Sequence, residues 1–300
     1  MDFSGVFAAL TTPFAADDSV AIADLKENIQ RYNATALAGY AVQGSTGESV
    51  LLSRAEWDRV LVAAKEAASP QKKLLAGTGV ESTAETISRT KRAAELGYHA
   101  ALVKTPYYYK PMYKPDVYIA HYRRVADASP IPVLLYSVPQ FTGISLEAPE
   151  VAVLAEHPNI VGIKESSGHV QRVAEMIAAT PASFQVLTGG AAVLFPSLAV
   201  GAKGAILALA SALPEKCAEL YEITRRGQID AARELQKTLL RASKLIVSEL
   251  GIPGVKFVMD QRGYRGGTPR LPLLPVAEAG KRRVLELLGA LEPAVATARN

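Results

Sequence analysis

The chain has 300 residues, 49% hydrophobic and 21% charged, which is enough to bury one large core. Its formal net charge of +4 is spread without a long basic block, so we expect no nucleic-acid partner. With one cysteine, Cys217, no disulfide can form within the chain, and neither a signal peptide nor an apolar stretch long enough for a membrane span is found, so we expect a cytoplasmic protein that binds no membrane.

Short apolar runs alternate with helical patterns at a spacing of roughly 30 residues, which is the size of a βα unit. Most runs are apolar throughout, as expected for parallel strands that are buried on both faces. The predicted strands are Val6–Leu10, Gly39–Val42, Lys73–Ala76, Ala100–Val103, Val133–Tyr136, Val161–Lys164, Gln185–Leu187 and Ala205–Leu207. The helical patterns include Ala23–Ala36, Arg54–Ala68, Ser82–Leu96, Pro115–Ala128 and Pro214–Arg226.

Eight such units predict an α/β fold, a (β/α)8 TIM barrel over residues 1–226. An open doubly wound sheet would need a phosphate-binding fingerprint after the first strand, and Thr11-Thr12-Pro13 is not one. Residues 227–300 predict a C-terminal helical extension packed on the barrel. We expect a long helix over Gln228–Leu250, ended by Gly251-Ile252-Pro253-Gly254, and a last helix over Glu278–Leu288.

Reacting groups of a (β/α)8 barrel lie at the C-terminal ends of its strands, and one lysine stands there among hydroxyls. Lys164 ends an apolar strand, and an amine desolvated by apolar walls has a lowered pKa that favours imine formation with a ketone. We therefore interpret Lys164 as the nucleophile. A strand-end lysine paired with a surface carboxylate is the simpler alternative, and Lys104 is a rival at another strand end.

Hydroxyl side chains at neighbouring strand ends suggest a proton relay and a carboxylate site. Tyr136 is the candidate proton carrier, although a core tyrosine with a satisfied hydroxyl gives the same pattern. Ser45 and Thr46 are candidates both for capping a following helix and for binding a carboxylate. Of Tyr107, Tyr108 and Tyr109, most are expected in a loop or interface.

The sequence gives no sign of a metal or of a dissociable cofactor. Its four histidines show no metal-ligand spacing, and no phosphate loop or dinucleotide fingerprint occurs. We therefore expect no metal and no cofactor other than a covalent imine on Lys164.

Four motifs, in this order and spacing, resemble the dihydrodipicolinate synthase and N-acetylneuraminate lyase family of Schiff-base lyases. They are Gly44-Ser45-Thr46-Gly47-Glu48, Thr105-Pro106-Tyr107-Tyr108, Tyr136-Ser137-Val138-Pro139 and Gly162-Ile163-Lys164-Glu165. The resemblance covers nearly the whole chain and implies a TIM barrel that cleaves or joins 2-keto acids and aldehydes. It also implies a homo-oligomer, commonly a tetramer built as a dimer of dimers.

The resemblance assigns roles to matching positions. Lys164 matches the imine-forming lysine and Tyr136 the proton-shuttling tyrosine. Ser45 and Thr46 match the pair that binds the pyruvyl carboxylate, and Thr46 also belongs to the relay. Tyr108 matches the tyrosine that completes the relay from a neighbouring subunit. Two further positions are concerned with substrate: Ile206, whose backbone faces the keto acid, and Phe141, where synthases carry an arginine for the carboxylate of aspartate semialdehyde.

A phenyl ring cannot pair with a carboxylate, so Phe141 argues against the synthase reaction. The segments leading into Tyr136 and around Gly251-Ile252-Pro253-Gly254 most resemble 4-hydroxy-2-oxoglutarate aldolase, which releases pyruvate and glyoxylate. The glyoxylate carboxylate is expected near Ser45, Ser166 or the amides after Gly189. We rank this aldolase first, the synthase second and a sugar-acid lyase or dehydratase third. A non-catalytic keto-acid-binding barrel is the alternative of another class.

Overall fold

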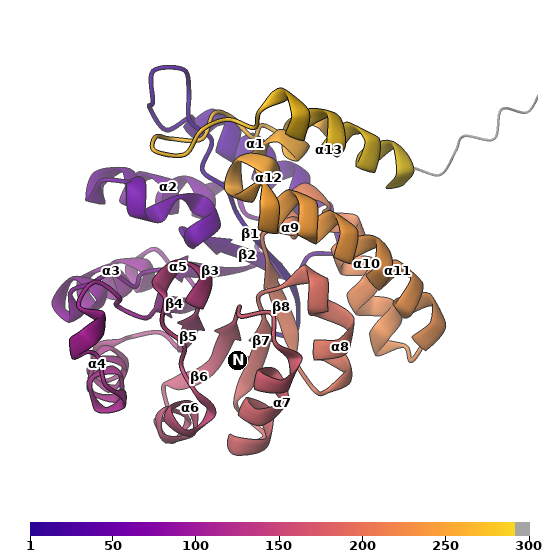
Figure 1. Ribbon diagram of the computed structural model, residues 1–300. Helices are drawn as coiled ribbons and strands as arrows, with labels where there is room; N and C mark the ends of the chain where they lie inside the picture. Colours follow the sequence, from indigo (N-terminus) through magenta and orange to yellow (C-terminus); the bar gives the residue numbers. More distant parts are fainter. Residues whose placement is uncertain (292–300) are drawn as a thin grey trace, which may run out of the picture.

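The computed structural model describes residues 1–291, in which eight parallel strands close into a barrel in sequence order (Figure 1). The last strand pairs with the first, which confirms the predicted (β/α)8 TIM barrel. The strands are β1 (Gly5–Ala9), β2 (Gly39–Val42), β3 (Lys73–Gly77), β4 (Ala100–Lys104), β5 (Val133–Ser137), β6 (Ile160–Glu165), β7 (Gln185–Thr188) and β8 (Gly204–Leu207).

Within residues 1–291, each strand is followed by a helix of six or more residues before the next strand or, after β8, before the C-terminal helices. These helices are α1 (Ile22–Asn33), α2 (Arg54–Ala67), α3 (Thr83–Glu95), α4 (Pro115–Ala128), α6 (Ala148–Ala155), α7 (Val170–Ala179), α8 (Leu194–Ala199) and α10 (Pro214–Arg225). The short helices α5 (Pro139–Thr142) and α9 (Leu209–Ala212) follow β5 and β8. Ser53 begins α2 with a reciprocal capping box to Glu56, which sets the start of that helix.

Alternate residues of the strands point into the barrel. Leu102 and Tyr136 belong to the interior cluster, together with Phe7, Leu75 and Ile206. Because side chains alternate along a strand, Lys104 points to the same side as Leu102. Lys164 is in register with Tyr136 on the neighbouring parallel strand, so it also points inward. The barrel interior therefore ends in a layer of polar side chains.

The chain continues after α10 into helices that lie along one side of the barrel, drawn in orange and yellow in Figure 1. They are α11 (Ile229–Ala242), a π-helical segment (Ser243–Glu249), α12 (Gly251–Gln261) and α13 (Glu278–Leu291). The stretch Gly251-Ile252-Pro253-Gly254, which we expected to end the long helix, also begins α12. Pro253 lies in the first turn of this helix, where its missing N–H leaves no hydrogen bond unmade.

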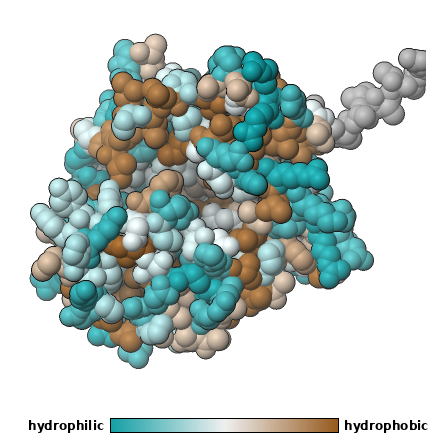
Figure 2. Space-filling model, viewed as in Figure 1, coloured by the Kyte–Doolittle hydropathy of each residue, from teal (hydrophilic) through white to brown (hydrophobic). Residues whose placement is uncertain are grey.

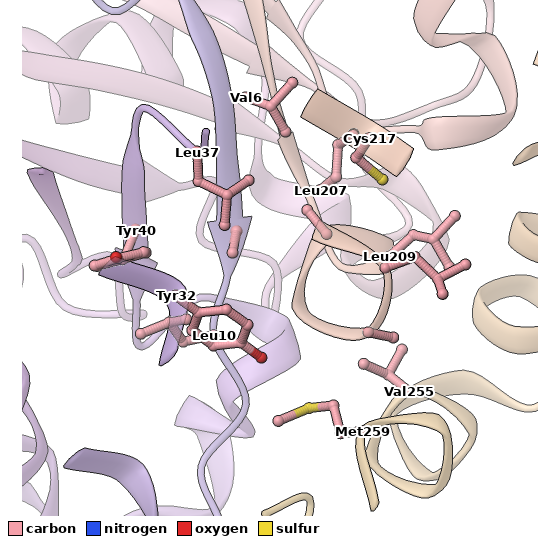
Figure 3. Close-up of a cluster of buried hydrophobic side chains, with 14 of the residues drawn as sticks. Val6, Leu10, Tyr32, Leu37, Tyr40, Leu207, Leu209, Cys217, Val255 and Met259 are labelled. Atoms are coloured by element: carbon pink, nitrogen blue, oxygen red, sulfur yellow. The ribbon is translucent and has the colours of Figure 1, made fainter. Parts of the chain in front are cut away.

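Helix α12 packs beside the end of β1. Its residues Val255 and Met259 join Leu10 and Leu209 in a buried cluster (Figure 3). The Thr11 hydroxyl donates to Met259 Sδ over 3.3 Å. The helices after the barrel therefore contact the rim where strand ends carry the candidate site residues. The division of the chain at residues 226 and 227 remains a prediction, and its last residues, 292–300, lie outside the described part.

Within residues 1–291, no helix has the length and apolar character that crossing a membrane requires.

Candidate active site

Lys164 and Tyr136 face each other across two adjacent strands. They pair in register, and Lys164 Nζ lies 4.2 Å from the centre of the Tyr136 ring. Both residues are buried, with 5% of Lys164 and 4% of Tyr136 exposed. Among residues 1–291, Lys164 forms no ion pair with a carboxylate, and the Tyr136 ring is the aromatic face beside its amine. A desolvated amine without a neutralising partner is suited to nucleophilic attack on a carbonyl.

The Tyr136 hydroxyl lies 3.3 Å from Ser45 Oγ, on the turn that follows β2. This turn is a single 3₁₀ turn, Ser45–Gly47, and Thr46 within it is buried. The hydrogen-bond partner of the Tyr136 hydroxyl is thus Ser45, and not Thr46, which we expected in the relay. The expectation that Ser45 and Thr46 cap the following helix is wrong, because Ser53 caps α2.

Several strand ends carry buried polar atoms that lack a hydrogen-bond partner within residues 1–291. They are Gln43 Oε1, Thr105 Oγ1 and Ser166 Oγ. Gly189 lies directly against the last of these: a Cβ at Gly189 would be 1.8 Å from Ser166 Oγ. Unpartnered buried polar atoms are uncommon in native proteins, and their gathering at one rim is typical of a site that a polar ligand completes.

Figure 2 shows that the face viewed in Figure 1 is hollowed near its centre. One small hollow is lined by Gln43, Ser45, Lys104 and Tyr136. A larger one of about 220 Å³ adjoins it and shares Lys104 with it.

Lys104, the rival nucleophile, has a different environment from Lys164. Its Nζ lies 3.7 Å from Glu81 Oε1 and 4.6 Å from the centre of the Tyr107 ring. Burial lowers the pKa of Lys104, while Glu81 opposes that shift. What distinguishes the two lysines is this ion pair with Glu81, since Lys164 has no such carboxylate partner within residues 1–291.

The remaining predicted site residues lie in two places. Ile206 is fully buried on β8, in register with Phe7 and inside the barrel. Tyr108 is 73% exposed, and no hydrogen bond joins its side chain to Tyr136 or Ser45 within the described part of this chain. A single chain therefore brings together Lys164, Tyr136 and Ser45, and leaves Tyr108 facing outward.

Sequence reasoning missed Glu81, which organises the loop after β4. Its Oε2 accepts the backbone N–H groups of both Tyr107 and Tyr108 over 2.9 Å. The available signal was a carboxylate just beyond the Gly77-Thr78-Gly79 strand end, a position from which it can reach a neighbouring βα loop.

No group of three or more His, Cys, Asp and Glu residues in the described chain is placed to hold a metal ion. The reactive groups at this rim are the Lys164 amine, the Tyr136 phenol and the Ser45 hydroxyl. A barrel with an inward-facing lysine against a tyrosine–serine pair belongs to the class I, Schiff-base type of carbon–carbon lyase.

The chain belongs to the dihydrodipicolinate synthetase family, whose model matches residues 2–291. A 4-hydroxy-tetrahydrodipicolinate synthase from an Exiguobacterium species is 37% identical over 286 residues, which is 95% of this chain and 97% of the relative. A dihydrodipicolinate synthase from Bacillus anthracis has a similar structure, with a TM-score of 0.93, 28% identity and coverage of 98% of this chain and 100% of that one. The corresponding enzyme from Acinetobacter baumannii, solved with pyruvate, gives a TM-score of 0.91 at 31% identity, covering 95% of this chain and 98% of that one.

Proposed function

We propose that Lys164 forms an imine with the keto group of pyruvate. The enamine formed from this imine then adds to an aldehyde that carries a carboxylate. The observation that carries this proposal is the stacking of Lys164 Nζ on Tyr136, whose hydroxyl contacts Ser45. The amine lies beside the hydroxyl pair of Tyr136 and Ser45, which can carry protons. Both the formation and the hydrolysis of an imine require such proton transfer.

The proposed steps balance without a cofactor. The neutral Lys164 amine adds to C2 of pyruvate, and the carbinolamine loses water to give a protonated imine. Loss of a C3 proton gives the enamine, whose C3 forms the new bond with the aldehyde carbon while Tyr136 protonates the aldehyde oxygen. Water then hydrolyses the imine and restores Lys164. Cleavage follows the same steps in reverse.

Pyruvate also needs a partner for its carboxylate. The Ser45 and Thr46 turn supplies hydroxyls beside Tyr136, and we assign this turn to the pyruvyl carboxylate. Ser166 Oγ and the backbone after Gly189 lie across the rim, with the hydroxyl unpartnered in the described chain, and are candidates for a second polar group of substrate. Ile206 belongs to the same interior cluster as Tyr136, and we assign its backbone to the face of the bound keto acid.

The relatives support aspartate semialdehyde as the first candidate for the aldehyde, because they are named 4-hydroxy-tetrahydrodipicolinate synthases. The sequence analysis ranked 4-hydroxy-2-oxoglutarate aldolase above the synthase. The comparisons do not support that order, so we now place the synthase reaction first. Cleavage of 4-hydroxy-2-oxoglutarate to pyruvate and glyoxylate is the second candidate. One observation favours it: Phe141 is 62% exposed at the position where a synthase needs a guanidinium group.

We also propose a homo-oligomer, a dimer of dimers, in which Tyr108 serves the site of a neighbouring subunit. Tyr108, Tyr109 and Met112 are large apolar side chains, exposed by 73%, 62% and 71% on one βα loop. Such a group on a single chain is typical of a protein interface.

The proposal is tested by incubating the protein with pyruvate and borohydride and mapping the reduced adduct by peptide mass spectrometry. We expect one adduct, on Lys164, and inactivation. Failure to trap any of a panel of 2-keto acids would instead support a barrel that binds keto acids without catalysis.

A further inference from the structure

Glu48 closes the turn that carries Ser45 and Thr46. It adopts a left-handed conformation with φ of 55°, and its N–H donates to Ser45 O over 3.0 Å. The Thr12 hydroxyl donates to Gly47 O over 2.7 Å. The backbone of this turn is therefore fixed at both Gly47 and Glu48, and any shift of Glu48 is passed to the two hydroxyls.

The carboxylate of Glu48 is fully buried and is held by the chain segment that follows the barrel. Lys256 Nζ, on α12, lies 2.5 Å from Glu48 Oε1, and the side chains of Lys256 and Glu48 are exposed by 1% and 0%. The other oxygen, Oε2, accepts the backbone N–H of Arg270 over 2.9 Å. Lys256 Nζ also donates to Thr268 O over 2.9 Å. A buried ion pair needs such exact partners because its desolvation is costly.

Arg270 binds the residues that follow the same turn in the sequence. Its guanidinium donates to Leu51 O over 2.9 Å and to both oxygens of Glu56 over 3.1 and 2.7 Å. The Phe14 ring contacts both cations, with Lys256 Nζ 4.6 Å and the Arg270 guanidinium 4.2 Å from its ring centre. Glu48 and Leu51 in the β2–α2 connection and Glu56 in the first turn of α2 are thus bound by residues that follow the barrel.

We infer that Lys256 and Arg270 are positioning residues, which set the place of the Ser45 and Thr46 hydroxyls through Glu48. This inference rests on the proposed function, in which these hydroxyls bind the pyruvyl carboxylate. The helices after the barrel then act on the reaction without touching substrate. Because hydrogen bonds to a carboxylate weaken steeply when their distance or angle is disturbed, a loosened turn is expected to weaken pyruvate binding measurably.

The test uses pyruvate and borohydride trapping on Lys164, which needs no aldehyde. Lys256→Met keeps the length of the side chain and removes its charge. We expect the pyruvate concentration for half-maximal adduct to rise at least fivefold, while the maximal adduct rate changes less than threefold. Arg270→Met removes the contacts to Leu51 and Glu56 but keeps the backbone bond to Glu48, so we expect a smaller rise in the same direction.

Val284→Ala is the matched control for loss of stability. Val284 is fully buried in α13 and has no contact with the turn in the hydrogen-bond and ion-pair network above. We expect this variant to lower the melting temperature and to leave the half-saturating pyruvate concentration unchanged. If Lys256→Met does not fold, Arg270→Met carries the test alone.

Two results would overturn the inference. One is that Lys256→Met and Arg270→Met lower the melting temperature as Val284→Ala does, with no change in half-saturation. The other is that they reduce the maximal adduct rate alone, which would place their effect on the chemistry at Lys164. Absence of trapping in the parent protein would instead reject the proposed function itself.

Discussion

Lys104 and Lys164 lie at the same level of the barrel, one strand to either side of Tyr136. The two amines differ in the side chains that surround them. Lys164 Nζ stacks on Tyr136, whereas Lys104 Nζ lies on Tyr107 with Glu81 3.7 Å away. We therefore expect Lys164→Met to abolish the borohydride-trapped pyruvate adduct and Lys104→Met to retain it. An adduct that survives Lys164→Met and maps to Lys104 would contradict the assignment of the nucleophile.

Tyr136→Phe removes the hydroxyl that contacts Ser45 and keeps the ring beside Lys164. A general acid–base group contributes about 10²–10⁴-fold to rate, so we expect kcat to fall in that range. The matched control is Tyr98→Phe, because the Tyr98 hydroxyl is buried and donates to Leu61 O, away from the rim. This control should lose about 1 kcal/mol of stability and no turnover. Comparable kcat values for Tyr136→Phe and Tyr98→Phe would show that the Tyr136 hydroxyl takes no part in proton transfer.

The strands and their terminal residues were predictable because local pattern determines them. An apolar run followed by a polar residue places Tyr136 and Lys164 at strand ends, and closure of eight such runs brings them together. The structure extends β5 and β6 one residue beyond the prediction, since the backbone ladder continues past the first polar side chain.

Features that depend on distant pairing were not predictable. Glu48 and Lys256 are far apart in sequence, and no local pattern indicates that each neutralises the other. Gly251 and Pro253 indicate a helix break, and they do mark one, but the chain re-enters a helix at once because Pro253 falls in its first turn. Tyr108 is 73% exposed in the single chain, so its proposed contact with a neighbouring subunit stays a prediction.

Tyr108 provides the test of assembly. If it completes the relay of a neighbouring site, Tyr108→Phe should lower kcat at least tenfold, while sedimentation gives the same oligomer as the parent. Tyr109→Phe is the matched control, since Tyr109 stacks edge-to-face on Tyr108 at 5.0 Å and is similarly exposed. It should keep full activity. A fully active monomer would refute both the assembly and the role of Tyr108.

His121 is expected to make the folded protein sensitive to mild acid. It is 6% exposed, its Nδ1 lies 2.9 Å from the Thr83 hydroxyl, and burial lowers its pKa from 6.5 to about 4. Because the folded-state pKa lies below the unfolded one, the unfolded chain binds the extra proton between about pH 4 and 6.5, and stability falls as pH drops through this window.

The expected loss from His121 between pH 7 and pH 5 is about 2 kcal/mol, from the free energy per pKa unit. Urea unfolding at the two pH values measures it in the parent and in His121→Gln, which lacks the titration. His169→Gln is the control, because His169 is exposed. An equal pH dependence in the parent and in His121→Gln would show that other groups cause the acid sensitivity.

The choice of aldehyde is expected to depend on Phe141. Its ring cannot pair with the carboxylate of aspartate semialdehyde, whereas a guanidinium at that position can bind it with two charge-assisted hydrogen bonds. Because Phe141 is 62% exposed at the end of a short helix, Phe141→Arg should fold normally. We expect it to raise kcat/KM for aspartate semialdehyde about tenfold or more, which corresponds to about 1.4 kcal/mol of transition-state binding. Cleavage of 4-hydroxy-2-oxoglutarate should change less.

The measurement is kcat/KM for both reactions on the parent, on Phe141→Arg and on a neutral control, Phe141→Met. Lys110→Met belongs in the same series, because the Lys110 amine lies next to Gly143, two residues beyond Phe141. A Cβ built at Gly143 would be 2.7 Å from Lys110 Nζ. This ammonium is the nearby cation that can replace the missing guanidinium. If the parent already prefers the semialdehyde and Lys110→Met removes that preference, Lys110 binds the carboxylate and the argument from Phe141 fails. If Lys110→Met has no effect and Phe141→Arg creates the preference, the aldehyde pocket of the parent is built for the shorter glyoxylate.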